Sequence, residues 1–333
     1  MMNITKAIAY SIEKDRYPSS SHRHCTPSSP EELEEQEDAS ILQLNSFPVT
    51  INTKEYENAK SGSNPNGDLR PLFAFRQLAD PAPSFEQYYS LSGKSTENLF
   101  QNFLHGAQAK AGASFTESVI NSSLGQFSGD TFANMDGTSG VWRPVYAVPE
   151  DWPTADINRY KNLSVDLSGE GEKNSIVLIS KGSPFKWQQD GQSQGRPHPS
   201  SRINSINLKY LLVRFNRPWF NPLLFETAEW YLSGQKAGFC SSGSLEQNDG
   251  VFPLMTTAML IAKEVKINAD WHPSDQKIIQ DAKTQNKSLA LGPLTVVMPP
   301  DEDRNVQIIG YLSQLIPFSP QMDGKEQQQQ LDR

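Results

Sequence analysis

One long apolar stretch, residues 203–216, constrains the fold of this 333-residue chain more than any other feature. Its sequence, INSINLKYLLVRFN, puts apolar side chains on both faces of an extended strand, because successive side chains point to opposite faces. One face carries Ile206, Leu208, Tyr210 and Leu212, and the other carries Leu211, Val213 and Phe215. A strand that is apolar on both faces needs a packed layer on each side. We therefore expect this strand in the middle of a sheet with a core above and below it.

Further strands are predicted on both sides of this stretch. Apolar runs of strand length, separated mostly by turn residues, favour antiparallel pairing. The expected strands lie at residues 41–51, 162–168, 175–180, 227–233, 254–267, 288–298 and 306–316. Residues 72–78 (LFAFRQL) also alternate weakly between apolar and polar side chains.

Helical periodicity appears between residues 85 and 125, and again at 274–285, where Pro273 lies near the start. Ser95 is placed to cap a helix whose apolar face consists of Leu99, Phe100, Phe103, Leu104 and Ala107. Ser114 and Glu117 have the spacing of a capping box, and Gly125 is expected to end that second helix.

These elements predict an α+β fold with a mainly antiparallel, β-rich body, preceded by a helical segment and a disordered N-terminal arm. We divide the chain into a disordered acidic arm (1–40), an extended arm with the helical segment (41–135), the β-rich body (136–320) and a polar tail (321–333). The first segment is rich in Ser, Pro and Glu and has too few apolar side chains to offset the entropy of ordering.

The net charge of the chain limits the classes of molecule that we expect it to bind. The chain has 30 Lys and Arg against 38 Asp and Glu, a formal net charge of −8. Nucleic-acid binding relies on basic side chains that displace counterions from phosphates, so we expect no nucleic-acid partner. No apolar run reaches the roughly 20 residues of a spanning helix, so no stable membrane span is expected. The N-terminus also lacks the apolar core of a secretory signal.

The two cysteines, Cys25 and Cys240, are too few for a disulfide scaffold and suit a reducing compartment, which favours the cytoplasm. His22, His24 and Cys25 have side chains that suit zinc, but no second ligand cluster completes a tetrahedral site. We expect no metal site. No phosphate-binding glycine loop or dinucleotide fingerprint occurs, so no cofactor is expected either.

One motif points towards a hydrolase. Residues 191–195 (GQSQG) match the G-x-S-x-G pattern of a nucleophile elbow, and an acid and a histidine follow, for example Glu226 and His272. An elbow needs a helix directly after the serine, whereas Pro197 and Pro199 follow here. We therefore expect a polar loop and assign no catalytic residue. An enzyme with a non-sequential site, with His105 or His272 beside a carboxylate, stays the alternative.

Residues 111–141 allow a second alternative. They are rich in small residues and contain no Lys or Arg, as in segments that rearrange into membrane hairpins. A pore-forming toxin would keep this segment loosely packed and detachable.

Arg, Pro and Trp recur together at two places, residues 142–144 and 217–219. Arg and Trp dominate binding hot spots, but Pro and Trp also make good structural corners. The candidate binding residues are Arg217, Trp219, Phe220, Trp142 and Arg143. Our first hypothesis is thus a soluble, non-catalytic binding or assembly protein. Its sheet edges and Arg/Pro/Trp corners would contact a protein partner or a second copy of the chain.

Overall fold

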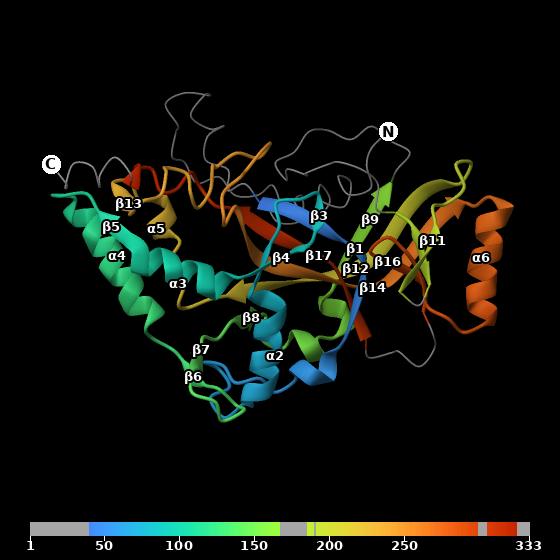
Figure 1. The fold of residues 1–333 in the computed structure, drawn as a ribbon. Coiled ribbons are helices and arrows are strands. Elements are labelled where there is room, and N and C mark those ends of the chain that lie inside the picture. Colours follow the sequence, from blue (N-terminus) through green and yellow to red (C-terminus); the bar gives the residue numbers. More distant parts are fainter. Residues whose placement is uncertain (1–39, 167–184, 190, 299–304, 325–333) are drawn as a thin grey trace, which may run out of the picture.

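The computed structural model describes residues 40–166, 185–189, 191–298 and 305–324. The expected central strand is β12, and it lies inside a seven-stranded sheet (Figure 1). The strand order is β3-β1-β17-β14-β12-β8, and β9 also pairs with β12. Among the described strands of this sheet, β1 and β3 pair in parallel and the other neighbours pair antiparallel. The strands are β1 (Ser40–Asn52), β3 (Tyr88–Tyr89), β8 (Tyr146–Val148), β9 (Lys161–Asp166), β12 (Arg202–Asn216), β14 (Leu254–Asp270) and β17 (Asn305–Leu315).

Smaller sheets and helices cover this sheet. A four-stranded sheet has the order β11-β10-β15-β16, with β10 (Trp187–Gln189), β11 (Gln192–Gly195), β15 (Leu289–Leu291) and β16 (Leu294–Val297). Three ribbons pair β2 (Pro81–Pro83) with β4 (Leu91–Ser95), β5 (Ala107–Ala109) with β13 (Trp230–Leu232), and β6 (Phe132–Ala133) with β7 (Val141–Trp142). The helices are α2 (Leu69–Ala79), α3 (Thr96–Gly106), α4 (Ser114–Phe127), α5 (Leu223–Glu226) and α6 (Pro273–Thr284). Short 3-10 turns are η1 (Thr53–Tyr56), η2 (Trp152–Thr154) and η3 (Ile157–Arg159). The described fold is therefore α+β and mainly antiparallel, as predicted.

The two faces of β12 belong to two separate cores. Val213 and Phe215 join a cluster with α2, α3, α4 and α5, and Leu211 packs against it. Ile206, Leu208 and Tyr210 join a second cluster with β10, β15, β16 and α6. We call these sides the α3 face and the α6 face. Figure 1 shows α3 and α4 at one end of the molecule and α6 with β11 at the other. The alternation read from the sequence thus holds in the structure.

Strand β1 pairs with a strand that lies far from it in the sequence. It lies between β3 and β17, and its register runs from the pair Ser40–Gln314 to the pair Asn52–Asn305. The first strand therefore belongs to the same sheet as the body that follows the helices.

Three local predictions need correction. Residues 72–78 form part of helix α2, because Leu72, Phe75 and Ala79 share one buried face at helical spacing. The capping box is absent: Ala113 is the N-cap of α4, with no side-chain hydrogen bond, and Ser114 is already helical. The helix also continues through Gly125 to Phe127.

Two other helix signals are confirmed, whereas Ala107, expected on the apolar helix face, lies in strand β5, and part of the expected helical stretch before Thr96 forms strands β3 and β4. Ser95 caps α3, since its hydroxyl accepts a hydrogen bond from Asn98 N at 3.1 Å. Helix α6 begins at Pro273, with His272 as its N-cap. The predicted strand at 175–180, the N-terminal arm with its His22, His24 and Cys25 cluster, and residues 325–333 lie outside the described residues. Across the described ranges, every helix is too short or too polar to cross a bilayer.

Candidate ligand-binding site

Arg217 follows β12 and lies in the interior of the α3 face. Its Nη1 donates to Thr256 O at 2.7 Å and its Nη2 donates to Ala79 O at 2.5 Å, so it ties the ends of α2 and β14 together. Burial lowers the pKa of Arg217 to about 10, and the nearby Asp80 carboxylate opposes this shift. The guanidinium stays charged at neutral pH, and its role in the fold is to hold backbone carbonyls.

Trp219 and Phe220 turn the chain away from the end of β12. The Trp219 ring is 1% exposed, and its Nε1 donates to Pro144 O at 2.8 Å. Both rings pack around Phe100 of α3, with centroid distances of 6.2 Å for Trp219 and 4.5 Å for Phe220. These contacts match the structural corner that the sequence also allows.

The motif at residues 142–144 contacts the motif at residues 217–219, because Pro144 O accepts the hydrogen bond from Trp219. Trp142 is buried, and its Nε1 donates to Ala133 O at 3.2 Å. The Arg143 guanidinium lies 3.5 Å from the centre of the Phe127 ring and donates to Glu97 Oε1 at 2.9 Å. Four of the five candidate residues contact the core of the α3 face, and the fifth, Trp142, packs against Phe73 and Phe132. Their role in binding a partner stays a prediction.

Glu97 is the centre of a buried ionic network that the sequence did not reveal. Its carboxylate accepts from Arg143 at 2.9 Å and from Arg76 Nη2 at 2.7 Å, and its side chain is only 6% exposed. Its backbone N donates to Asp80 Oδ1 at 3.0 Å. The network fastens α3 to α2 and to the loop that follows β7.

The G-x-S-x-G residues do not form a nucleophile elbow. Ser193 lies in the exposed strand β11, where it pairs with Gln188, and the chain continues into a loop before β12. The motif is exposed, as predicted, but the expected loop is wrong, because Gln192–Gly195 pair with β10 as strand β11. A strand–turn–helix arrangement, which an elbow requires, is missing at these residues.

The histidines and the acid of the hydrolase alternative also lack the neighbours that a catalytic triad requires. His105 and Glu226 are exposed on different helices. His272 stacks on His198 with a centroid distance of 3.6 Å, and its Nδ1 lies 2.8 Å from Ser274 Oγ. The nearby buried carboxylate of Asp275 accepts directly from Ser201 Oγ at 2.5 Å. A triad needs the imidazole between the hydroxyl and the carboxylate, which is not the arrangement here.

Residues 111–141 fold as helix α4 and the β6–β7 ribbon. Ile120 and Phe127 of α4 are buried in the core of the α3 face. Thr116 Oγ1 donates to Ala228 O at 2.9 Å, and Gln126 Nε2 donates to Pro218 O at 2.7 Å. These contacts tie the helix to the segments around α5.

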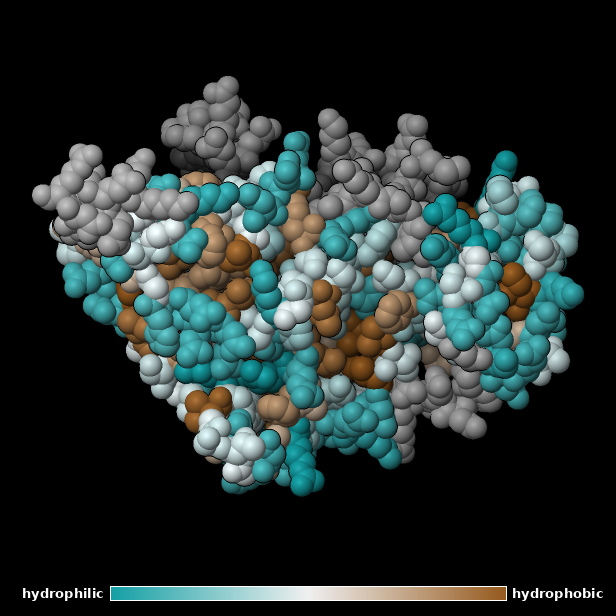
Figure 2. All heavy atoms as spheres, viewed as in Figure 1, coloured by the Kyte–Doolittle hydropathy of each residue, from teal (hydrophilic) through white to brown (hydrophobic). Residues whose placement is uncertain are grey.

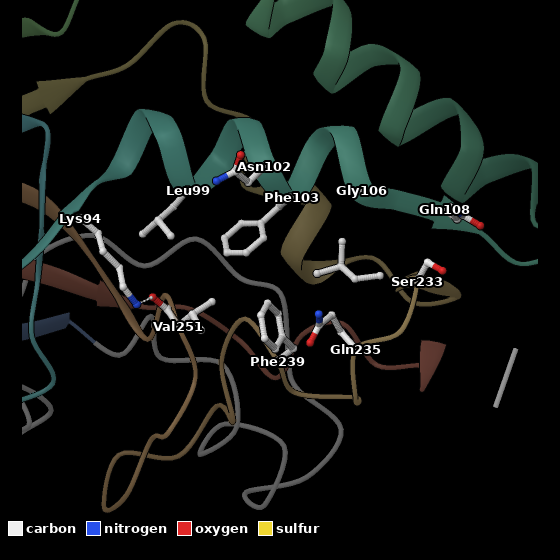
Figure 3. Close-up of a pocket in the computed structure, with 11 residues that line it drawn as sticks. Lys94, Leu99, Asn102, Phe103, Gly106, Gln108, Ser233, Gln235, Phe239 and Val251 are labelled. Atoms are coloured by element: carbon white, nitrogen blue, oxygen red, sulfur yellow. Dashed lines mark hydrogen bonds between the residues drawn. The ribbon is translucent and has the colours of Figure 1, made fainter. Parts of the chain in front are cut away.

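A slot of about 490 Å³ opens beside helix α3 (Figure 3). Leu99 and Phe103 of α3 point into it from one side, and Phe239 and Gln235 face them from the loop after β13. Figure 2 shows hydrophobic residues gathered on this part of the surface, above α3 in the left half of the view. The eleven described lining residues are Lys94, Leu99, Asn102, Phe103, Gly106, Gln108, Leu232, Ser233, Gln235, Phe239 and Val251.

The slot has an apolar middle and polar ends. Lys94 lies at one end, and Gln108 with Ser233 lies at the other, with Leu99 and Phe103 between them (Figure 3). Ligand sites in proteins typically occupy about 300–1,000 Å³ and combine an apolar lining with a few polar groups. The slot therefore has the size and composition of a small-molecule site.

Helix α3 and the β5–β13 ribbon build the slot. Phe103 is anchored by Phe225 and Phe252, with centroid distances of 5.9 Å and 6.1 Å. At Gly106 a Cβ atom would lie 3.1 Å from Leu232 Cδ2, so a glycine lets α3 approach β13 closely here. The sequence predicted Leu99 and Phe103 on the apolar face of a helix. It gave no sign of the facing residues, which come from a loop more than a hundred residues later.

Clusters of His, Cys, Asp or Glu that could hold a metal ion are absent from the described part of the chain. Cys240 is a buried free thiol, and burial raises its pKa. Comparison with known proteins finds no matching family model, no similar curated protein and no similar solved structure.

Proposed function

We propose that this chain is a non-catalytic binding protein whose ligand site is the slot beside α3. The observation that carries the proposal is the lining itself: an apolar middle formed by side chains from separate segments, with polar groups at the ends. Among the eleven described lining residues, Lys94 alone has a titratable side chain. A general acid–base pair, which most hydrolytic mechanisms use, has no candidate in this lining.

The Arg/Pro/Trp corners support this proposal indirectly. Trp219 and Phe220 pack against Phe100, on the opposite side of α3 from solvent, and so hold the helix that forms one wall. A rigid wall limits the ordering cost of binding. The corners thus serve the site as its support, and direct contact of these side chains with a partner stays a secondary prediction.

Contact through sheet edges remains part of the assembly hypothesis. Among the described strands, the outer ones of the large sheet are short: β3 has 2 residues, β8 has 3 and β9 has 6. Short edges give little backbone for strand addition by a protein partner or a second copy. The slot is therefore the better-supported contact site. The scarcity of cysteine keeps the cytoplasm as the proposed location.

A bulky side chain in the slot tests the proposal. We expect the full chain to bind dodecanol, used below its solubility limit, and Leu99→Trp to weaken that binding at least about tenfold, because the indole fills the apolar middle. Asn98→Trp, an exposed position on the same helix, is the matched control and should change the affinity less than about twofold. Calorimetric titration measures both, and circular dichroism confirms folding. Equal effects of the two variants, or the absence of binding of both dodecanol and dodecanoate, would overturn the proposal.

A further inference from the structure

One end of the slot carries a positive charge without an acidic partner. Lys94 Nζ donates a hydrogen bond to Val251 O at 3.3 Å. Within the described residues, Lys94 forms no ion pair. An ammonium group has three donors, so two remain for an anion at the mouth of the slot.

The other lysines close to slot residues in sequence are already paired. Lys236, beside Gln235, lies 3.1 Å from Asp249 Oδ2. Lys110, two residues after Gln108, lies 3.7 Å from Glu229 Oε1. Carboxylates are also absent from the described lining of the slot. Among the described lining residues, Lys94 is therefore the one that carries a charge.

We infer that the slot takes an amphiphile with one anionic head group, a free medium-chain carboxylate. This inference rests on the proposed binding function. The carboxylate binds Lys94, and the apolar body lies along Leu99, Phe103 and Phe239 towards the opposite end (Figure 3). A neutral alcohol of the same length fits the apolar middle equally well but gains no charge-assisted hydrogen bond.

The size of the slot suits a medium-chain ligand. A volume of about 490 Å³ lies within the range of about 300–1,000 Å³ that ligand pockets occupy. Dodecanoate, with about 14 heavy atoms, is a small ligand for a pocket of this range.

Residues 325–333 of the chain match the slot less well than dodecanoate does. The last described residue, Gly324, lies at the slot, since its N donates to Gln235 O at 2.9 Å. The residues after it, 325–333 (KEQQQQLDR), contain four glutamines and a single aliphatic residue, Leu331. They offer little apolar surface for a lining such as that of Phe103 and Phe239.

Three probes of equal chain length test the inference: dodecanoate, dodecanol and dodecyltrimethylammonium, each below its micelle concentration. Calorimetry on the full chain should show that dodecanoate binds about two- to fivefold more tightly than dodecanol, the effect of an exposed ion pair that contributes up to about 1 kcal/mol. The cationic probe should bind most weakly. In Lys94→Gln the ratio of the dodecanoate affinity to the dodecanol affinity should fall to about one. Lys110→Gln, the matched control, should keep the preference.

Each result has a separate meaning. Equal affinities for dodecanoate and dodecanol, or a preference that survives Lys94→Gln, would overturn the inference and leave the binding function standing. No binding of any probe would overturn both. Binding to phosphatidylglycerol vesicles without binding of free dodecanoate would also overturn the inference, because it would indicate docking on a membrane surface. Leu331→Ser should change dodecanoate affinity less than about twofold, and a tenfold gain would mean that the C-terminal residues fill the slot.

Discussion

The α3 face and the α6 face of the central sheet are packed with different side chains. The α3 face buries Trp152, Trp219 and Trp230 together with a group of phenylalanines. The α6 face is mainly aliphatic, with Trp187 as its single buried tryptophan among the described residues. The α3 face is also where the described part of the chain leaves buried polar atoms without partners: Thr96 Oγ1, Arg217 Nε and Trp230 Nε1.

The two faces also differ in the interactions that hold the covering elements on the sheet. On the α6 face, strands β10, β15 and β16 form their own hydrogen-bonded sheet over the aliphatic core. On the α3 face, helices and loops are held by single groups, such as the Trp219 N–H on Pro144 O and the Glu97 network. The slot lies on this side of the molecule, where helices and loops form the layer that covers the sheet.

The largest effect is expected for Trp219→Ala. Loss of the buried ring should lower the free energy of unfolding by about 3–5 kcal/mol. Trp219→Phe keeps a ring but leaves Pro144 O without its donor, which should cost about 1–3 kcal/mol. On the α6 face, the matched change Leu260→Met should cost less than about 1.5 kcal/mol. Urea denaturation measures all three variants. A stable Trp219→Ala protein would contradict the structural account of the corner.

The next effect comes from the ionic network. Glu97→Gln leaves Arg143 without its buried counter-charge and leaves Arg76 with Asp80 alone, 3.6 Å away, and we expect a loss of about 3 kcal/mol. Glu229→Gln, which breaks the exposed pair with Lys110, is the control and should cost less than about 1 kcal/mol. Thermal unfolding compares the two variants. Equal losses would show that the α3 face does not depend on Glu97.

A smaller effect on the free energy of unfolding is expected at alkaline pH. Burial raises the pKa of Tyr160, on the α3 face, to about 12, against about 10 in the unfolded chain. The stability that this tyrosine contributes is therefore complete below about pH 10 and is lost as the pH rises towards 12. Between about pH 9 and pH 11 the free energy of unfolding should fall by about 1 kcal/mol more in the unchanged protein than in Tyr160→Phe. Urea titrations at both pH values measure this difference, and identical pH profiles would contradict it.

The smallest effect on stability is expected for Lys94→Gln. The side chain is exposed, so the free energy of unfolding should change by less than about 0.5 kcal/mol. The same variant should lose the preference for an anionic probe. A stability change as large as that of Glu97→Gln would mean that Lys94 supports the fold and would weaken its assignment to the ligand.

The sequence predicted the sheet better than the site. The alternation in β12 gave both faces correctly, because a period of two is fixed by the strand itself. Ser95 was found because a cap acts within three residues. Leu72 and Phe75 were missed as helical, since seven residues are too few to separate the two periods. The slot could not be found, because Phe103 and Phe239 meet only through the pairing of β5 with β13. Glu97 escaped notice for the same reason, as its partners lie on α2 and after β7.

The central claim, that the slot beside α3 binds a small anionic amphiphile, is tested most directly by a crystal structure of the full chain with ω-bromododecanoate. We expect the carboxylate within hydrogen-bond distance of Lys94 Nζ. The anomalous signal of the bromine should lie at the opposite end, near Leu232 and Gly106. A bromine peak outside the slot, or an empty slot in crystals where the compound binds elsewhere on the chain, would contradict the claim.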